Sequence, residues 1–215
     1  MTSEQQAAPG RLTIVSAPSG GGKTSLTRAL LPRLATHGLL ARISVSYTTR
    51  APRSGELEGE HYHFVEDARF VEMIARGEFL EHAEVFGRRY GTGRARTQAL
   101  LDQGCDVILD IDWQGARQVR ALLPDAQSVF ILPPSLAELE RRLRARSQDD
   151  DEVIARRMGD ARREMSHYDE YDYLIVNDDF DAALEALVAV FLAPRLSRPA
   201  QERRHAALIA ELLAN

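Results

Sequence analysis

Short runs of apolar residues alternate along this chain with longer stretches in which apolar residues recur every three or four positions. The short runs are typical of strands buried in a sheet; they cover residues 12–16, 107–111, 129–132 and 173–176. The longer stretches predict helices; these cover residues 24–36, 114–123, 135–146, 151–167 and 181–192. This alternation favours an α/β fold, a mostly parallel sheet flanked by helices on both faces.

Two segments depart from the alternation. Residues 44–96 hold short apolar runs among many charges and glycines, which predicts a small α+β insertion. Residues 141–163 are helical and rich in arginine, with an acidic run at 149–152. Beside a nucleotide site such helices would form a lid, whereas composition alone favours a solvated charged face.

The predicted organisation is therefore a core interrupted twice. We expect a disordered tail at 1–10, the insertion at 44–96 and the lid at 141–163, with an amphipathic surface helix at 199–213. The core comprises the remaining segments, residues 11–43, 97–140 and 164–215.

Composition restricts the classes of partner. The chain has 215 residues, 27 of them basic and 32 acidic, for a net charge of −5, which argues against binding nucleic acid through overall charge. Its only cysteine, Cys105, excludes an intramolecular disulfide. No apolar run approaches the roughly 20 residues that span a bilayer, and the first ten residues do not resemble a secretion signal. We expect a cytoplasmic protein with small-molecule partners; its oligomeric state stays open.

A glycine-rich loop follows the first predicted strand and opens the first predicted helix. This is the context of a P-loop, whose backbone N–H groups converge on phosphate oxygens. Its lysine would contact the β- and γ-phosphates, and its threonine hydroxyl would bind Mg²⁺. The loop residues are Ala17, Pro18, Ser19, Gly20, Gly21, Gly22, Lys23 and Thr24. Alanine stands at position 17 where the general pattern has its first glycine, so a glycine-rich turn with a chance lysine is the alternative.

The position of the lysine supports the P-loop. Lys23 is the only lysine among the 27 basic residues, and random placement would put it here once in 27 times. A compact ammonium fits inside a phosphate-binding loop in which a planar guanidinium would be crowded.

The insertion contains residues that suit a second phosphate. Arg50 and Arg53 lie three positions apart and are followed by Tyr62, so forked guanidinium donors and a phenolic hydroxyl are available. Taken alone, the two arginines are more simply explained as surface partners of Glu56 and Glu58.

Seven segments together resemble one family, from about residue 11 to the C-terminus. They are SAPSGGGKT, SYTTRAPRSGE, EFLEHAEVFG, RYGT, ILDIDWQG, FILPPS and IVNDD. This set is similar to that of the guanylate kinase family. The resemblance implies a P-loop kinase fold with a GMP-binding insertion and a lid, and transfer of the γ-phosphoryl group of ATP to GMP and dGMP in purine metabolism, with Mg²⁺ as cofactor.

The resemblance also implies roles for individual residues. It places the acceptor phosphate against Arg50, Arg53, Tyr62 and Tyr90. It places the guanine against Ser46, Glu81, Thr92 and Asp112. Guanine offers N1–H and N2–H₂ donors to carboxylates and an O6 acceptor to hydroxyls, whereas adenine would leave a buried carboxylate unpaired.

The family pattern implies further roles at the ATP side. Arg146 and Arg157 would close over the phosphates as catalytic lid arginines, and Asn177 would lie near the adenine, although an Asx turn also explains it. Asp110 would hold Mg²⁺ through water. The chain departs from the pattern at Arg89 and on either side of Arg146; the flanking residues are Ala145 and Ser147.

Two other functions stay open at this point. One is a catalytically silent guanylate-kinase-like module that binds protein ligands, although such modules typically lack the intact loop and its lysine. The other is a P-loop kinase for a different monophosphate, which the pair of Glu81 and Asp112 argues against.

Overall fold

A five-stranded sheet forms the centre of the molecule. The computed structural model describes residues 9–85, 87–146 and 150–214, with the side chain of Arg146 excepted. The strands lie in the order β2-β7-β1-β8-β9 and every neighbouring pair is parallel. They are β1 (Leu12–Ser16), β2 (Ala41–Ile43), β7 (Asp106–Asp110), β8 (Gln127–Leu132) and β9 (Tyr173–Val176). The predicted α/β fold with a mostly parallel sheet is confirmed.

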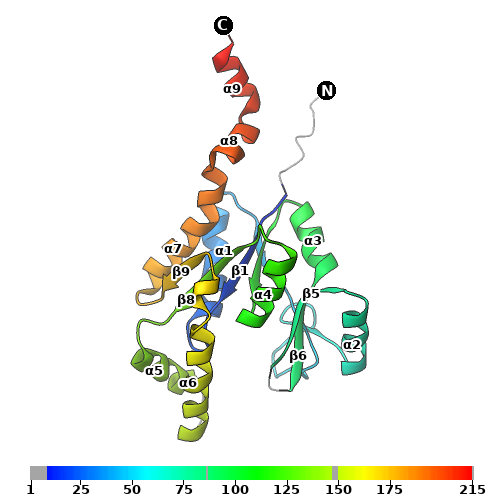
Figure 1. Ribbon diagram of the computed structural model, residues 1–215, viewed down its shortest axis with the longest axis vertical. Helices are drawn as coiled ribbons and strands as arrows, with labels where there is room; N and C mark the ends of the chain where they lie inside the picture. Colours follow the sequence, from blue (N-terminus) through cyan, green and yellow to red (C-terminus); the bar gives the residue numbers. More distant parts are fainter. Residues whose placement is uncertain (1–8, 86, 147–149, 215) are drawn as a thin grey trace.

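Helices cover both faces of this sheet (Figure 1). Because successive strand residues point to opposite faces, Val15 packs on α1 (Lys23–Thr36) and α7 (Phe180–Leu192). Ile14 faces the other way, toward α3 (Arg94–Asp102) and α4 (Trp113–Leu122). The helices predicted at 24–36, 114–123, 135–146, 151–167 and 181–192 are observed, each with ends within two residues of those bounds.

A second, four-stranded sheet lies wholly within residues 44–96. Its order is β4-β3-β6-β5, with β5 and β6 antiparallel and a small core of Phe70, Met73 and Phe79 beneath it. Its elements are β3 (Tyr47–Thr48), β4 (His63–Phe64), α2 (Asp67–Ala75), β5 (Phe79–Val85) and β6 (Arg88–Gly93).

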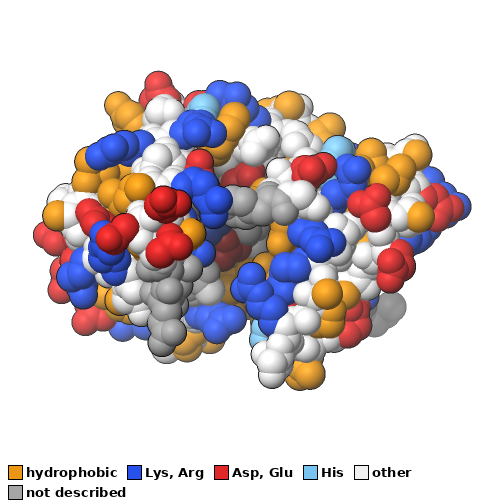
Figure 2. Space-filling model, turned by 90° about the horizontal axis from the view of Figure 1, so that it is seen from below, with side chains coloured by type: hydrophobic (Ala, Val, Ile, Leu, Met, Phe, Trp, Pro, Cys, Tyr) orange, Lys and Arg blue, Asp and Glu red, His pale blue; other side chains and the backbone are white. Residues whose placement is uncertain are grey.

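Two helices project beside the central sheet, opposite the second sheet. They are α5 (Leu136–Arg146) and α6 (Asp151–Met165), which share a core of their own that includes Leu139, Leu143 and Ile154. Figure 2 shows a hollow between these two halves of the molecule, with Lys and Arg side chains on both of its rims.

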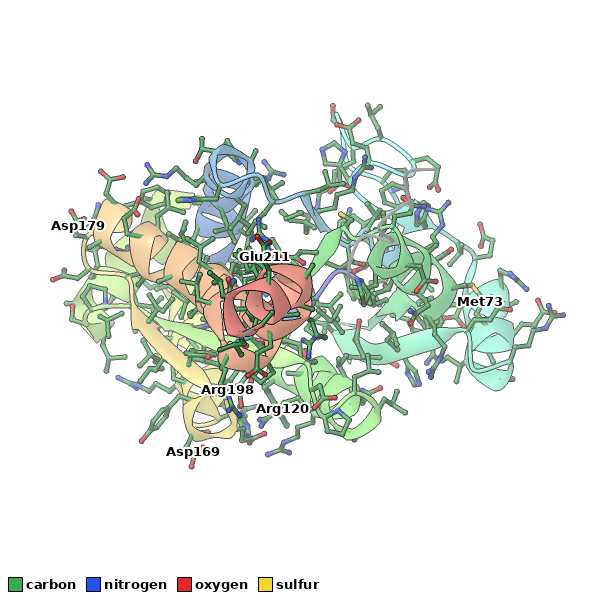
Figure 3. All side chains as sticks on the ribbon, turned by 90° about the horizontal axis from the view of Figure 1, so that it is seen from above. Met73, Arg120, Asp169, Asp179, Arg198 and Glu211 are labelled. Carbon is green, nitrogen blue, oxygen red and sulfur yellow. The ribbon has the colours of Figure 1, made fainter. Side chains whose placement is uncertain are left out.

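Two predictions about the C-terminal third need correction. The single helix expected at 199–213 is two helices, α8 (Arg198–Arg204) and α9 (Ala206–Leu213), separated at His205; both are on the surface, as expected. Figure 1 shows them projecting from the central-sheet half at the end opposite α5 and α6, and Figure 3 looks down on them from above, with Arg198 and Glu211 labelled. Residues 173–176 do form a strand, but only Ile175 is buried, because β9 is an edge strand. Within the part of the chain that the structure describes, no helix is long and apolar enough to cross a membrane.

Candidate active site

The glycine loop lies between β1 and α1, at the carboxyl edge of the parallel sheet. Gly20 has φ 85° and Gly22 has φ 95°, left-handed values that favour glycine. Gly22 also begins α1, so the loop ends at a helix N-terminus. This is the backbone geometry of an anion-binding loop.

Lys23 points from the loop across the end of β7. Its ammonium lies 2.6 Å from the Asp110 carboxylate and donates to the Ile111 carbonyl at 3.2 Å. Both side chains of the ion pair are about one-fifth exposed. The lone lysine is therefore held at the mouth of the loop by the strand end that also carries Asp110.

Asn177 supports the loop from behind. This residue is buried, and its side-chain amide donates to the Gly21 carbonyl at 3.0 Å. A Cβ at Gly22 would lie only 2.2 Å from the same amide nitrogen, so position 22 must be glycine. Arg142 of α5 in turn donates to the Asn177 carbonyl at 3.1 Å.

A carboxylate from α6 also contacts the loop. The backbone N–H of Ser19 donates to Glu164 at 3.0 Å, across 145 residues of sequence. Burial raises the pKa of Glu164, while the Ser19 N–H and the charge of Lys23 favour its ionised form. Glu164, one residue past the predicted lid, thus connects the C-terminal end of α6 to the phosphate-binding loop.

Glu81 and Thr92 are the two fully buried members of the predicted guanine set. Glu81 is 4% exposed and accepts a hydrogen bond from the Thr92 hydroxyl at 2.7 Å. Since a hydroxyl carries one proton, Thr92 orients Glu81 here and does not donate elsewhere. Glu81 also lies against Gly115, where a Cβ would come within 2.7 Å of a carboxylate oxygen.

The second predicted carboxylate, Asp112, begins α4. It caps that helix by accepting from the Gly115 N–H at 2.9 Å. Burial, and to a smaller degree the charge of Asp112, raise the pKa of Glu81 to about 7. The two carboxyl groups are therefore close enough for the charge of one to act on the other.

The predicted acceptor-phosphate residues gather on the second sheet. The Arg50 guanidinium lies 5.3 Å from the centre of the Tyr62 ring, and the rings of Tyr62 and Tyr90 meet edge-on at 6.0 Å. Arg50 pairs with Glu56 at 2.8 Å, which raises the arginine pKa and lowers the pKa of Glu56 to about 2. The expected pairing of Arg50 with Glu56 is therefore present. It lies within a cluster whose guanidinium and phenolic groups are of the kinds that bind a phosphate.

The structure also places three other predicted residues. Arg53 lies on the exposed loop after Arg50, and Ser46 contributes a carbonyl to the N–H of His63. Arg157 is half-buried on α6. The side chain of Arg146, and Ser147 beside it, fall outside the described residues.

An aromatic stack joins the guanine side of the site to the end of α6. The Trp113 indole stacks on His167 with ring centres 3.8 Å apart, and Arg117 lies 4.6 Å from the indole centre. Trp113 directly follows Asp112, and His167 lies two residues beyond α6. The stack therefore connects the first residue of α4 with the segment just after α6.

The donor set beside the loop fits Mg²⁺. Thr24 supplies a hydroxyl at the first turn of α1, and Asp110 supplies a carboxylate at the end of β7. Magnesium prefers oxygen ligands and usually takes only one or two from the protein, the rest from water and substrate phosphates. Among the described residues, no three His, Cys, Asp or Glu side chains gather closely enough to hold a metal.

Three contacts at the site were not anticipated from the sequence. Glu164 on the loop, Gly115 against Glu81, and Gln118 on the backbone of His82 each join segments far apart in the chain. Glu164 lies in a run of charges and Gln118 on a solvated helical face, so no local pattern distinguishes them. Only Gly115, a glycine within the first turn of a predicted helix, is locally unusual.

The parallel sheet, the glycine loop after its first β-strand and the lysine at the mouth of that loop define a P-loop nucleotide-binding protein. Known proteins identify the family. The family model described as guanylate kinase matches residues 9–193. The guanylate kinase of Escherichia coli K12 is 59% identical over 208 residues, covering 97% of this chain and all of that protein. The guanylate kinase of Vibrio cholerae is 57% identical over 205 residues, covering 95% and 98%.

A solved structure agrees with the sequence comparisons. The crystal structure of guanylate kinase from Anaplasma phagocytophilum has a TM-score of 0.71 at 34% identity and covers 89% of each chain. The chain belongs to the guanylate kinase family.

Proposed function

We propose that this protein is an ATP:GMP phosphotransferase that also accepts dGMP, with its substrates in the cytoplasm. A phosphate oxygen of GMP attacks the γ-phosphorus of ATP, the bond to the β–γ bridging oxygen breaks, and GDP and ADP result. The observation that carries the proposal is the buried Glu81 carboxylate beside Asp112, within the same site as the Lys23 loop. Family membership supports the same activity.

The acceptor base is recognised by hydrogen-bond polarity. Glu81 and Asp112 accept from the guanine N1–H and N2–H₂, and a Ser46 hydroxyl faces O6. Adenine has no 2-amino group, and its 6-amino group is a donor where guanine has an acceptor. AMP would therefore leave a buried carboxylate without a partner, which costs on the order of several kcal/mol.

The acceptor phosphate is held by the arginine and tyrosine cluster. Arg50 and Arg53 supply forked donors, while Tyr62 and Tyr90 supply hydroxyls. Because Arg50 pairs with Glu56 in the structure, binding of the phosphate would exchange one anionic partner for another.

The donor phosphates are held by the loop. Its N–H groups and Lys23 stabilise charge on the β- and γ-phosphates, and Arg146 and Arg157 add positive charge from the lid. Magnesium, bound by Thr24 and through water by Asp110, would supply further charge neutralisation. Asn177 supports the loop backbone through its bond to Gly21.

A coupled assay of ADP release tests the proposal. GMP and dGMP are expected to be good acceptors, and AMP and UMP poor ones. No turnover with any acceptor would overturn the enzyme assignment, and a preference for AMP would overturn the base-recognition argument. Arg53→Ala is expected to raise the KM for GMP with the KM for ATP little changed; an unchanged GMP KM would remove Arg53 from the acceptor site.

A further inference from the structure

The two carboxylates proposed to bind guanine come from different parts of the fold. Glu81 lies on β5 of the second sheet, whereas Asp112 begins α4 on the central sheet. In Figure 1, α4 stands between the central sheet and β5. Recognition of one base by both carboxylates therefore requires β5 to be held at a fixed position relative to α4.

A β-bulge in β5 separates the side chain of Glu81 from that of the residue before it. Phe79 pairs with Gly93 and Glu81 pairs with Thr92, so Leu80 between them is unpaired. The Leu80 side chain is 5% exposed and packs into the core beneath the central sheet. The residue before Glu81 is thus anchored in the core.

The residue after Glu81 is anchored by Gln118. The side-chain oxygen of Gln118 accepts from the His82 N–H at 3.1 Å, and its side-chain nitrogen donates to the His82 carbonyl at 2.8 Å. An amide side chain can do both at once because it carries a donor and an acceptor side by side. Gln118 lies on the same helix as Asp112, six residues further along.

We propose that Gln118 is a positioning residue for guanine recognition, which aligns Glu81 with Asp112 by pairing with the backbone of His82. The proposal rests on the proposed function of the site. Gln118 does not itself contact the base; it fixes one carboxylate relative to the helix that carries the other. If these hydrogen bonds served only stability, their removal would lower the melting temperature and leave the preference between nucleotides unchanged.

Gln118→Met tests this, since methionine has a similar size and forms neither hydrogen bond. We expect the KM for GMP to rise roughly tenfold, the factor for weakening about one hydrogen bond, and the KM for ATP to change less than about twofold. The preference for GMP over IMP, which lacks the 2-amino group, is expected to fall. Gln103→Met, at an exposed position after α3, is the matched control and should match the wild type.

A double-mutant cycle with Glu81→Gln shows whether Gln118 acts through Glu81. If it does, adding Gln118→Met to Glu81→Gln should raise the KM for GMP little further. Gln118→Glu, which keeps an acceptor for the His82 N–H but presents no donor at neutral pH, should also raise the KM for GMP, and it gives the same measurement if the methionine variant is unstable.

An unchanged GMP KM and an unchanged preference over IMP in Gln118→Met would overturn the proposal, as would full additivity in the cycle. Absence of GMP turnover by the wild type would instead overturn the proposed function of the site. The two failures are therefore distinguishable.

Discussion

Replacing Glu81 with glutamine is expected to stabilise the protein without ligand, by an amount that grows with pH. Glu81 is 4% exposed in the wild type and accepts a hydrogen bond from the Thr92 hydroxyl. Burial and the neighbouring Asp112 raise the pKa of Glu81 from 4.5 to about 7. Glutamine has nearly the same shape, can still accept from Thr92, and carries no charge to desolvate.

The size of the effect follows from proton linkage. Between pH 4.5 and 7 the unfolded chain has lost the Glu81 proton and the folded chain still holds it. Because the folded state binds more protons in this window, the free energy of unfolding of the wild type falls as pH rises, and the loss is complete above about pH 7. At about 1.4 kcal/mol for each tenfold change in proton affinity, the total is roughly 3 kcal/mol.

Urea unfolding at pH 5, 6, 7 and 8 measures the effect. The free energy of unfolding of Glu81→Gln should exceed that of the wild type by less than about 1 kcal/mol at pH 5 and by roughly 3 kcal/mol at pH 8. Glu202→Gln, at an exposed position on α8, removes the same charge and should show no such trend. Turnover of GMP by Glu81→Gln should be strongly reduced, since the group that destabilises the free protein is the one proposed to bind the base.

Two results would refute the reasoning. A stability difference that does not grow between pH 5 and pH 8 would show that Glu81 does not titrate with a raised pKa. A glutamine variant less stable than the wild type at pH 8 would show that the carboxylate stabilises the pocket.

Three further substitutions test other parts of the site. Lys23→Arg should lose most of its kcat while its circular dichroism stays that of the wild type, because a guanidinium is too large for the loop; a near-normal kcat would contradict the size argument. Gly115→Ala should raise the KM for GMP severalfold with ATP binding preserved, because its methyl group would lie 2.7 Å from a Glu81 oxygen; equal GMP titrations by calorimetry would contradict it. Glu164→Ala should raise the KM for ATP and leave that for GMP unchanged, because the Ser19 N–H loses its partner; equal changes in both constants would assign Glu164 to general stability.

The sequence predicts the parts of this fold that depend on neighbouring residues. Buried β-strands, helical faces and the loop at 17–24 are each contained in one short segment. The residue types that produce them therefore stand next to one another in the sequence. The three-residue β2 escapes prediction because Ala41–Ile43 is too short for a periodic signal. The prediction that residues 173–176 are all buried is wrong, because an apolar run does not show whether its strand lies in the centre or at the edge of a sheet.

Long-range contacts explain most of what the sequence does not show at the site. Glu81 and Asp112 could be named through the family resemblance, but their separation of 31 positions gives no local sign that they meet. The bonds from Gln118 to His82 and from Glu164 to Ser19 depend on tertiary packing alone. The commitment of the Thr92 hydroxyl to Glu81 is likewise a property of the folded pocket.

The stack of Trp113 on His167 has a practical consequence. Trp113 is the only tryptophan in the chain, and it directly follows a carboxylate proposed to contact the base. Its indole also contacts Arg117 and the segment after α6, so its emission depends on both the pocket and the projecting helices. Intrinsic fluorescence of the unlabelled protein therefore reports from a single known position, and stopped-flow mixing with each nucleotide can resolve the order in which the two halves of the molecule respond.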